Sequence, residues 1–426
     1  MLSDLAVKSA LLLYNMGWKL AIPILQKNCR LAEGFKQRTL QYKIPPAADI
    51  WIQSASAGES YLAAALLKNL KPFRNIRIFL TTNTAQGMEI LNHEIDKITQ
   101  NYGNISAYTA YFPFDSPSIM DVIIKNIHPK VMILLESEIW PGLIAALKKY
   151  GCKILVINGR ITSRSLARYL ICPSIWHKLK PDKILAVSED DAKRFAILFG
   201  KECVDIMSNM KFDRIGTAGR TSGKKNSLHK IFQGSSPIIV LGSVRRDEEP
   251  DVKKIIIDIY QRLPEVVIAV FPRHIHRIKY WEKILRNLPV NWILRSKIKS
   301  SIPCKTVILW DTFGELSSAY GLSQAAFVGG SLAPLGGQNF LEPLVCGVAP
   351  VIGPYWDNFA WVGDKIVKQG LVRVGSDWTQ VANLLAEDVK RPYSHEKIRI
   401  ATEKYVENRQ NGTDTACKLI NEFLNT

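Results

Sequence analysis

The sequence predicts an α/β protein made of two Rossmann-like domains, each built on a parallel sheet. From residue 49 onward, short apolar segments of strand length alternate with longer amphipathic segments of helix length. The alternation lapses at residues 216–236, which are rich in Gly, Ser, Thr and Lys, and then starts again. The chain also has 426 residues, more than one hydrophobic core usually supports.

The interruption divides the chain into expected domains. We expect an N-terminal segment at 1–44, a first domain at 45–215, a second domain at 216–400 and a C-terminal helix at 401–426 that can pack back on the first domain. Ligands of such open sheets bind beyond the carboxyl ends of the strands. The simplest arrangement therefore has the two domains facing each other across a ligand-binding cleft.

The N-terminal segment is apolar over residues 5–25, but Lys8, Lys19 and Pro23 interrupt it. A helix that spans a bilayer needs about 20 nearly uncharged residues. Basic residues outnumber acidic ones throughout residues 1–44, which is typical of a segment that lies on an anionic, cytoplasmic membrane surface. An amphipathic helix packed on its own domain and a single membrane span are the open alternatives.

In the first domain the predicted strands are short apolar runs. They lie at residues 50–54, 76–81, 131–135, 153–157 and 184–187, with a sixth near 204–207. Ser188 precedes an acidic run and predicts the start of a helix that ends at Gly200, because Ser caps helix N-termini and Gly ends helices.

The first strand runs into the sequence SASAGES, which holds Ser56, Gly58 and Glu59. We expect Gly58 to turn the chain and Glu59 to lie in the first turn of the next helix. The helix dipole stabilises a carboxylate there, so Glu59 is predicted to be charged at neutral pH and able to accept a proton. The alternative is that Glu59 serves only as a favourable first-turn residue.

Two more carboxylates, Glu136 and Glu138, follow the strand at 131–135, just before Pro141 opens a helix. They are predicted either to contact a polar substrate or to clamp a neighbouring Arg or Lys. The alternative is that both are solvated loop acids.

Basic residues follow the later strands of the first domain. Arg160 comes after the strand at 153–157, and Arg164 and Arg168 continue from it as a cationic rim suited to acidic or phosphorylated ligands. Lys211, with Asp213 beside it, occupies the equivalent position farther along the chain.

The second domain repeats the same pattern. Its predicted strands lie at residues 238–241, 266–270, 307–309, 326–328 and 349–352. Helices are predicted at 251–263 and 314–320, and the tail from 396 to 423 is predicted to be helical without further strands.

A glycine-rich loop at the end of the strand at 326–328 predicts a nucleotide site. The strand stops at Gly329, the loop holds Gly336 and Gly337, and Glu342 lies in the first turn of the next helix. Free backbone N–H groups in such a loop can hold a phosphate, and the carboxylate can bind a ribose. The alternative is a crossover whose glycines only make tight turns.

Two further strand ends are predicted to support this site. Arg273 follows the strand at 266–270 and can reach a phosphate. Thr312 is predicted to cap the helix at 314–320, so that the amides of its first turn face the ligand.

Composition excludes several classes of site. The net charge of +18 indicates an anionic partner, such as nucleic acid, a phosphorylated substrate or a membrane. The seven cysteines are scattered without a CxxC pair, which predicts reduced thiols and neither disulfides nor a zinc site. His274 and His276 are two residues apart at a strand end, where their rings are expected to point apart, so no metal site is predicted.

Taken in order, nine motifs closely resemble the bacterial 3-deoxy-D-manno-octulosonic acid (Kdo) transferases. The motifs are SASAGES, ESEIWPG, NGRITSRSLARY, SNMKFD, FPRHIHR, DTFGELSSAYG, AFVGGS, GGQNFLEP and GPYWDNF. The resemblance covers about residues 49–359. It implies the two-domain GT-B glycosyltransferase fold, and transfer of Kdo from CMP-Kdo to a lipid A precursor in lipopolysaccharide synthesis, at the cytoplasmic face of the inner membrane.

The resemblance also implies roles for individual residues. Glu59 is the general base of a single inverting displacement that needs no metal or other cofactor. The acceptor or Kdo pocket is implied to contain Ser56, Gly58, Glu136, Glu138, Arg160 and Lys211. CMP is implied to contact Pro272, Arg273, Phe313, Gly314, Glu315, Gly336, Gly337, Asn339 and Glu342.

Three positions depart from the usual family pattern. Arg245 and Gln338 stand where the family often has His, and Phe340 stands where it often has Pro. Another GT-B nucleotide-sugar enzyme, such as an epimerase, is the alternative within enzymes, but it gives no role to the basic, apolar N-terminus. A nucleic-acid-binding protein is suggested only by the net charge, and the chain lacks interleaved aromatic and basic recognition segments, so no nucleic acid partner is expected.

Overall fold

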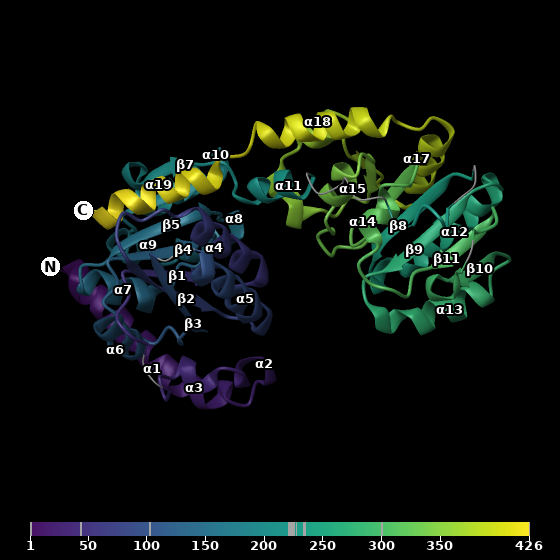
Figure 1. The fold of residues 1–426 in the computed structure, drawn as a ribbon. Helices are drawn as coiled ribbons and strands as arrows, with labels where there is room; N and C mark the ends of the chain where they lie inside the picture. Colours follow the sequence, from purple (N-terminus) through teal and green to yellow (C-terminus); the bar gives the residue numbers. More distant parts are fainter. Residues whose placement is uncertain are drawn as a thin grey trace. The chain divides into compact units, whose positions relative to one another are not determined.

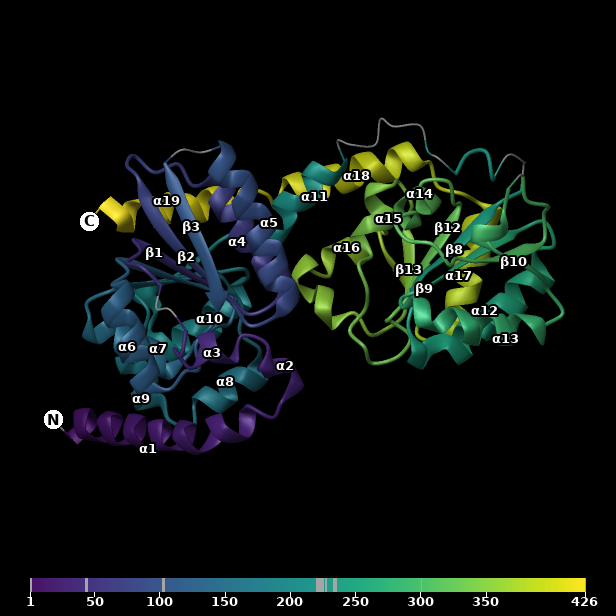
Figure 2. The ribbon, with the colours of Figure 1, turned by 60° about the horizontal axis from the view of Figure 1, so that its bottom comes forward.

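Two α/β units make up the computed structural model, which describes residues 2–42, 45–101, 104–219, 226, 228–232, 236–299 and 301–425. One unit comprises Met1–Asp213 together with Arg409–Thr426, and the other comprises Arg214–Asn408. The second unit is therefore a continuous segment, whereas the first is completed by the C-terminus of the chain. Figure 1 shows a helix-covered sheet in each unit, and Figure 2 shows the same elements from another side.

The first unit holds a seven-stranded sheet in the order β3-β2-β1-β4-β5-β6-β7, and neighbouring strands pair in parallel. The strands are β1 (Ile50–Ser54), β2 (Ile76–Thr82), β3 (Ile105–Tyr111), β4 (Val131–Leu135), β5 (Lys153–Gly159), β6 (Lys183–Ala186) and β7 (Val204–Ile206). The strand order reverses between β1 and β4, which is where ligands bind in sheets of this type.

Helices cover both faces of this sheet. The helices of this unit are α1 (Leu2–Leu25), α2 (Cys29–Ala32), α3 (Phe35–Arg38), α4 (Ala57–Asn69), α5 (Ala85–Asn101), α6 (Pro117–Ile127), α7 (Pro141–Lys149), α8 (Ser163–Tyr169), α9 (Pro173–Lys178), α10 (Glu189–Phe199) and α19 (Gly412–Asn425). Helix α11 (Lys211–Gly219) begins in this unit and continues into the second. On one face, α6, α7 and α10 pack around Trp51 and Phe79. On the other face, α4 and α19 pack against strand residues such as Ile52 and Ile133.

The second unit repeats this architecture with a seven-stranded sheet in the order β10-β11-β9-β8-β12-β13-β14, again with parallel pairing. The strands are β8 (Ile238–Val244), β9 (Val267–Pro272), β10 (Asn291–Leu294), β11 (Thr306–Leu309), β12 (Ala325–Val328), β13 (Pro350–Ile352) and β14 (Arg373–Val374). Here the order reverses between β8 and β12.

Several helices of the second unit that follow the carboxyl ends of strands are short. They are α12 (Glu249–Arg262), α13 (Ile278–Arg286), α14 (Leu316–Tyr320), α15 (Leu341–Val345), α16 (Lys365–Lys368), α17 (Trp378–Lys390) and α18 (His395–Glu407). Helices α12, α13 and α17 cover one face of the sheet with a continuous apolar core that includes Ile255, Trp281 and Leu385.

The predicted fold class, two parallel α/β sheets, is confirmed. The predicted strands are all present, but β3, β10 and β14 were missed. All three are edge strands or lie next to the edge, and β3, for example, is only partly buried over most of its length. Such strands do not need the continuous apolar run by which a buried strand is recognised.

The single helix predicted for the tail is wrong, because the tail forms two helices that belong to different units. Helix α18 ends at Glu407, and α19 starts at Gly412 after Asn411, whose φ is +74°. The backbone of Gly412 approaches Ser208 so closely that an added Cβ would lie 2.2 Å from its carbonyl oxygen. The Asn-Gly pair therefore reverses the local backbone and starts a new helix.

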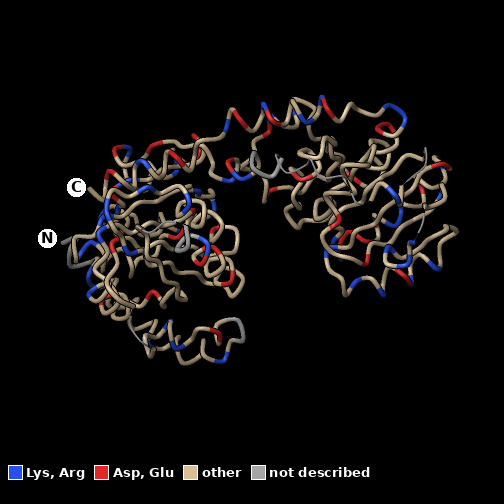
Figure 3. Tube along the Cα trace, viewed as in Figure 1, with Lys and Arg blue, Asp and Glu red and all other residues tan. Residues whose placement is uncertain are grey.

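Helix α1 forms as the apolar N-terminal segment predicts, and contacts α6, α7 and α9. Among the residues described, no helix has the length and apolar character that crossing a membrane requires. Basic residues lie in both units (Figure 3), in keeping with the net charge of +18.

Candidate active site

Glu59 lies at the carboxyl edge of the first sheet, just beyond β1. Ser56 is the N-cap of α4, its Oγ accepts from the Glu59 backbone N–H at 3.4 Å, and the hydroxyl donates to Glu59 Oε1 at 3.0 Å. The Ala55 backbone N–H donates to Glu59 Oε2 at 2.6 Å. Glu59 therefore lies in the first turn of its helix, as predicted, and its hydrogen bonds with the N-cap Ser56 and with Ala55 fix the direction of its carboxylate.

The prediction that Glu59 is a simple anion at neutral pH is wrong. Burial raises the pKa of Glu59 to about 7, against the hydrogen bonds from Ala55 and Ser56, and the negative charges of Glu138 and Glu136 raise it further. Burial is the largest of these effects, and the two neighbouring carboxylates add a smaller one, so that together they outweigh the hydrogen bonds at the helix terminus. A carboxyl group with a pKa near 7 suits general base catalysis at neutral pH better than a fully ionised one.

Gly58 does not turn the chain, contrary to the prediction. It lies inside the first turn of α4 and is not among the glycines with positive φ. A Cβ added at Gly58 would meet only Ser56 Oγ, at 3.7 Å. A small side chain would therefore fit at Gly58 without a clash, and the position needs no special backbone conformation.

Glu138 is nearly buried and is held by two side chains that the sequence did not single out. Gln53 Nε2 donates to Glu138 Oε2 at 3.1 Å, and Trp140 Nε1 donates to the same oxygen at 2.9 Å. Burial raises the pKa of Glu138 despite these two bonds. The only sequence signal for Gln53 is a polar residue inside an otherwise buried apolar strand, IWIQS.

Glu136 clamps basic residues, one of the two outcomes predicted for this pair of acids. Lys211 Nζ lies 2.6 Å from Glu136 Oε1, and Arg160 Nη1 lies 3.9 Å from Glu136 Oε2. Asn158 Nδ2 also donates to Glu136 Oε1, at 3.5 Å. The carboxylate thereby brings together the two cations that the sequence assigned to this pocket.

The backbone is strained where these side chains leave the sheet. Glu136, which directly follows β4, has a φ of +55°. Asn158, near the end of β5, has a φ of +57°, and neither residue is glycine. Asn158 is fully buried, and its Oδ1 accepts from the Met210 backbone N–H at 2.9 Å. Strain of this kind costs about 1–3 kcal/mol per residue and is commonly kept at functional sites.

Asp213 has a structural role next to this group. Its carboxylate accepts from the backbone N–H groups of Asn411 and Thr413, at 2.8 and 2.7 Å, and thereby caps α19. Arg164 and Arg168, the predicted cationic rim, are exposed on α8.

In the second unit, Pro272 ends β9, and Arg273 follows with its backbone N–H bonded to Val244 O at 2.8 Å. The Arg273 side chain is exposed, so it is accessible to an anion.

His274 and His276 were expected to point apart but stack, with ring centroids 5.4 Å apart and planes 14° apart. The chain leaves the strand in a 3-10 turn (Ile275–Arg277), which places them on the same side.

The helix after β11 starts later than predicted, and Thr312 is not its N-cap. The N-cap of α14 is Glu315, and the Thr312 hydroxyl instead donates to Glu315 Oε2 at 2.6 Å. Arg295 and Trp310 also donate to the Glu315 carboxylate. Burial would raise the pKa of Glu315, but these three bonds and the Arg295 charge outweigh it, so the pKa is lowered.

Glu315 therefore holds its own loop, and the exposed parts of the loop are Phe313 and Gly314. The Phe313 side chain is 81% exposed. Gly314 has φ of +83°, and a Cβ added there would meet nothing within 4 Å. An open, glycine-containing backbone next to an exposed ring is accessible to a ligand at the carboxyl edge of β11.

The amides that follow β12 are not free to bind a phosphate, contrary to the prediction. Glu248, which is 1% exposed, accepts hydrogen bonds from the backbone N–H groups of Gly330, Ser331 and Leu332, at 2.5, 3.2 and 3.3 Å. It also accepts from Arg245 N at 2.8 Å. The protein fills this anion-binding loop with its own carboxylate, a role for Glu248 that the sequence did not reveal.

The rest of the glycine loop packs on a neighbouring loop. Gly336 and Gly337 have φ of +82° and +80°. A Cβ on Gly336 would lie 2.4 Å from the Asn358 side chain, and one on Gly337 would lie 3.1 Å from Trp356. Both glycines therefore make the tight turns that the alternative interpretation expected, and their contact with CMP stays a prediction.

Asn339 and Glu342 lie where the sequence placed them, around the start of α15. Asn339 Oδ1 accepts from Leu341 N at 3.2 Å, and the Ser317 hydroxyl donates to Glu342 Oε1. Among the positions that depart from the family pattern, Phe340 is fully buried and packs against Phe359, with ring centroids 5.1 Å apart. The Gln338 amide donates to Gly337 O at 3.4 Å.

The described residues contain no cluster of three or more His, Cys, Asp or Glu side chains arranged to bind a metal ion. The free cysteines include Cys152, Cys203 and Cys417, which are buried, and Cys172 and Cys304, which are exposed.

Comparison with known proteins identifies the family. Residues 31–214 match the family described as 3-deoxy-D-manno-octulosonic-acid transferase (kdotransferase). The 3-deoxy-D-manno-octulosonic acid transferase of Haemophilus influenzae is 30% identical over 339 residues, which cover 78% of this chain and 77% of the relative. The enzyme of the same name from Rickettsia felis is 26% identical over 390 residues, covering 88% of this chain and 79% of the relative.

A solved structure supports the fold. The UDP-GlcNAc 2-epimerase of Neisseria meningitidis covers 88% of this chain and 99% of its own, with a TM-score of 0.53 at 12% identity. At that identity the likeness concerns the fold and not the reaction. From the Haemophilus relative and the family match together, the chain belongs to the 3-deoxy-D-manno-octulosonic acid transferase family and is a glycosyltransferase that transfers Kdo.

Proposed function

We propose that the protein transfers Kdo from CMP-Kdo to a lipid A precursor during lipopolysaccharide synthesis, at the cytoplasmic face of the inner membrane. Glu59 removes the proton from the attacking acceptor hydroxyl. The oxygen then displaces CMP at the anomeric carbon with inversion, and the leaving CMP keeps the bonding electron pair on its phosphate.

The observation that carries this proposal is the environment of Glu59. Two hydrogen bonds orient its carboxylate, and burial beside Glu138 and Glu136 raises its pKa to about 7. Gly58 beside it is exposed and has no side chain, so an acceptor hydroxyl can approach. A base with this pKa is half ionised at neutral pH and is protonated readily in the transition state.

The donor is proposed to bind at the carboxyl edge of the second sheet. Arg273 is exposed at the end of β9 and supplies a charge for the CMP phosphate, without any metal. Glu342 is proposed as the ribose ligand, since its bond to the Ser317 hydroxyl can be exchanged for one to a ribose hydroxyl. The backbone at Phe313 and Gly314 completes this side of the site.

The membrane location is supported by α1. Its exposed apolar side chains are Leu12, Leu13, Met16, Leu20 and Ile24. Lys8 and Lys19 are exposed on the same helix. An apolar stripe with flanking cations suits an anionic bilayer surface. Tyr14 and Trp18 lie against the protein body instead, through a hydrogen bond to Asp115 and a ring contact with Phe114.

The test is transfer from CMP-Kdo to a lipid A precursor in detergent, followed by mass spectrometry of the lipid product. The wild-type chain is expected to add Kdo, and Glu59→Gln is expected to lower kcat roughly 100-fold to 10,000-fold while CMP binding is retained. Glu94→Gln, a matched change at a carboxylate paired with Lys68 away from this edge, is expected to leave kcat unchanged. Substantial turnover by Glu59→Gln would overturn the assignment of the base.

A further inference from the structure

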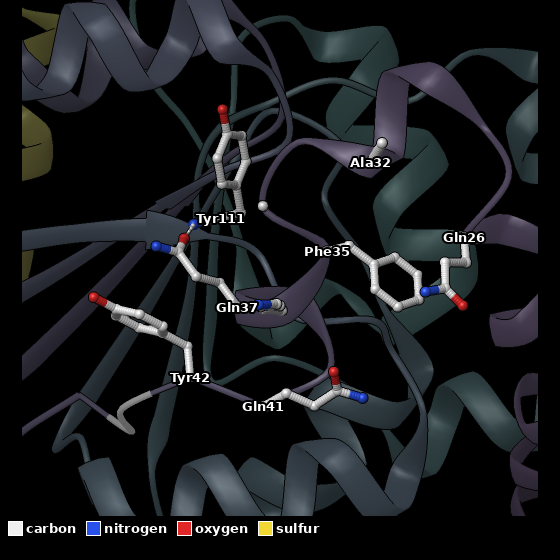
Figure 4. A pocket seen from close by; sticks show the side chains of 9 residues that line it. Gln26, Ala32, Phe35, Gln37, Gln41, Tyr42 and Tyr111 are labelled. Carbon is white, nitrogen blue, oxygen red and sulfur yellow. Dashed lines mark hydrogen bonds between the residues drawn. The ribbon is translucent and has the colours of Figure 1, made fainter.

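A pocket of about 570 Å³ opens in the first unit beside the end of β3 (Figure 4). The chain between α1 and β1 forms most of its wall. Its principal side chains are Gln26, Phe35, Gln37, Gln41, Tyr42 and Tyr111. None of the residues assigned to catalysis or to donor binding lines it.

The strand register places this pocket on the same edge as Glu59. Tyr111 pairs with Thr82 across β3 and β2, and Thr82 pairs with Ser54 across β2 and β1. Adjacent strands are roughly 4.8 Å apart, so Tyr111 lies about 10 Å from Ser54, the residue that leads into the Glu59 loop. A disaccharide can span that separation, so one molecule can reach both places.

The floor of the pocket is held in shape by several contacts. The Tyr111 backbone N–H donates to Gln37 Oε1 at 2.9 Å. Gly34 has φ of +74°, and a Cβ there would lie 2.0 Å from the Tyr111 ring, so the backbone approaches the ring as only glycine allows. Fixed walls favour binding because little side-chain freedom is lost when a ligand enters.

A buried cation lies beneath this floor. Arg38 is 3% exposed, and its guanidinium donates to Phe112 O at 3.1 Å and to Asn83 O at 2.9 Å. It also lies 4.8 Å from the centroid of the Tyr111 ring. Lys36 adds an exposed ammonium group at the rim. The residues that line the pocket include no acid. The nearby Glu33 carboxylate is hydrogen-bonded with the Tyr111 side chain.

These groups together suit a phosphorylated sugar ring. The amides of Gln26 and Gln41 can both donate to and accept from hydroxyl or amide groups of a sugar. Aromatic rings can offer flat apolar surfaces to its C–H faces, and Phe35, Tyr42 and Tyr111 line the pocket. Lys36 at the rim and Arg38 below favour a negative charge on the same ligand.

The pocket also lies next to the helix that is proposed to contact the membrane. Gln26 directly follows α1, whose exposed Leu20 and Ile24 lie in its last turns. A lipid whose chains remain in the bilayer beneath α1 would thus present its headgroup here.

We propose that this pocket is a distal acceptor subsite. It holds the phosphorylated sugar ring of the lipid acceptor that does not react, while the neighbouring ring presents its hydroxyl to Glu59. This inference rests on the proposed function, since it assigns one part of the acceptor of that reaction.

The experiment compares steady-state kinetics of the full-length wild-type chain and the double variant Gln41→Ala/Tyr42→Ala, in which both altered side chains are exposed. The KM for the lipid acceptor is expected to rise about tenfold, while kcat and the KM for CMP-Kdo stay within about twofold. A matched double variant, Phe73→Ala/Gln369→Ala, removes an exposed ring and an exposed amide elsewhere and is expected to leave all three constants unchanged.

The phosphate is tested separately with Lys36→Gln. This variant is expected to raise the KM for the phosphorylated acceptor about fivefold, and to match the wild type on an acceptor from which the phosphates have been removed. Equal effects on both acceptors would overturn the part of the proposal that concerns the phosphate.

The outcomes separate this inference from the proposed function. If the wild type transfers Kdo and Gln41→Ala/Tyr42→Ala leaves the acceptor KM unchanged, the subsite is wrong and the reaction stands. If the wild type transfers no Kdo to the lipid acceptor, the proposed function fails and the subsite fails with it.

Discussion

Glu59 illustrates how one residue combines opposing electrostatic effects. Its position in the first turn of α4 and the hydrogen bonds from Ala55 and Ser56 favour the anion. Burial and the nearby charges of Glu138 and Glu136 favour the neutral acid, and burial is the largest of these effects. The net result is a pKa of about 7, which a helix terminus alone would not produce.

The pKa of Glu59 predicts the pH dependence of catalysis. Only the ionised carboxylate can accept the acceptor proton, so kcat/KM is expected to fall about tenfold for each pH unit below 7 and to level off above it. Measuring kcat/KM for the acceptor from pH 5 to 9 checks this. An apparent pKa near the ordinary value of 4.5 would contradict the buried environment.

The same pKa predicts a pH-dependent stability. Because the pKa of Glu59 is higher in the folded protein than its ordinary value of 4.5, the folded state binds this proton more tightly. The resulting stabilisation is present below pH 4.5 and is lost as the pH rises to about 7. Relative to wild type, Glu59→Gln is therefore expected to gain up to about 3 kcal/mol between pH 5 and pH 8. Urea unfolding at both pH values measures this, and equal differences would show that burial does not control this group.

Glu248 is the second residue whose surroundings decide its role. Its carboxylate accepts four backbone hydrogen bonds, from Arg245, Gly330, Ser331 and Leu332. Glu248→Gln leaves one accepting oxygen and turns an NH₂ group toward N–H donors. It is expected to destabilise the protein by about 2–3 kcal/mol. Thermal unfolding tests this, with the exposed Glu265→Gln as the control that should not change stability.

At the scale of elements, α1 has two unlike faces. Val7, Tyr14 and Trp18 face the protein, whereas Leu13, Leu20 and other apolar residues are exposed. This division accounts for the alternatives that the sequence left open. The helix packs on its own domain and still presents an apolar stripe outward.

The exposed apolar stripe of α1 allows the proposed membrane binding to be tested. The double variant Leu13→Glu/Leu20→Glu is expected to weaken binding to anionic phospholipid vesicles roughly tenfold or more. It replaces apolar side chains with carboxylates, which the negatively charged lipid headgroups repel. Sedimentation with vesicles measures this, and circular dichroism verifies folding. Ile206→Glu, at another exposed apolar position, is the control. Undiminished binding of the α1 variant would locate the membrane contact elsewhere.

At the scale of the whole molecule, the two units differ in how the chain completes them. The second unit is the single segment Arg214–Asn408, whereas the first needs α19 from the C-terminus. Helix α19 buries Ala416, Cys417, Ile420 and Leu424 in the core of the first unit, on the face that also holds α4.

Removing residues 409–426 is therefore expected to unfold the first unit preferentially. Burial of Ile420 and Leu424 alone contributes about 1.5–3 kcal/mol each. By contrast, residues 214–408 expressed alone are expected to fold cooperatively. Thermal unfolding of both fragments and the full chain tests this, and an unchanged melting temperature after the truncation would show that α19 is dispensable.

The sequence by itself determined the alternating pattern of strands and helices, the repeated sheet and the order of motifs that identifies the family. These follow from local patterns, since a buried parallel strand must be apolar along its whole length. It also placed Glu59, Glu136, Glu138, Arg160 and Lys211 correctly at one edge, because parallel strands end on the same side of a sheet.

Only the tertiary structure decided the chemistry of these groups. The pKa of Glu59 depends on carboxylates nearly 80 residues away in sequence, and Glu248 fills a loop that the glycines alone suggested was open. The edge strands β3, β10 and β14, the break before α19 and the pocket at Tyr111 were likewise invisible in the sequence. Burial, charge and the occupancy of backbone amides are set by segments distant along the chain, which local sequence patterns do not encode.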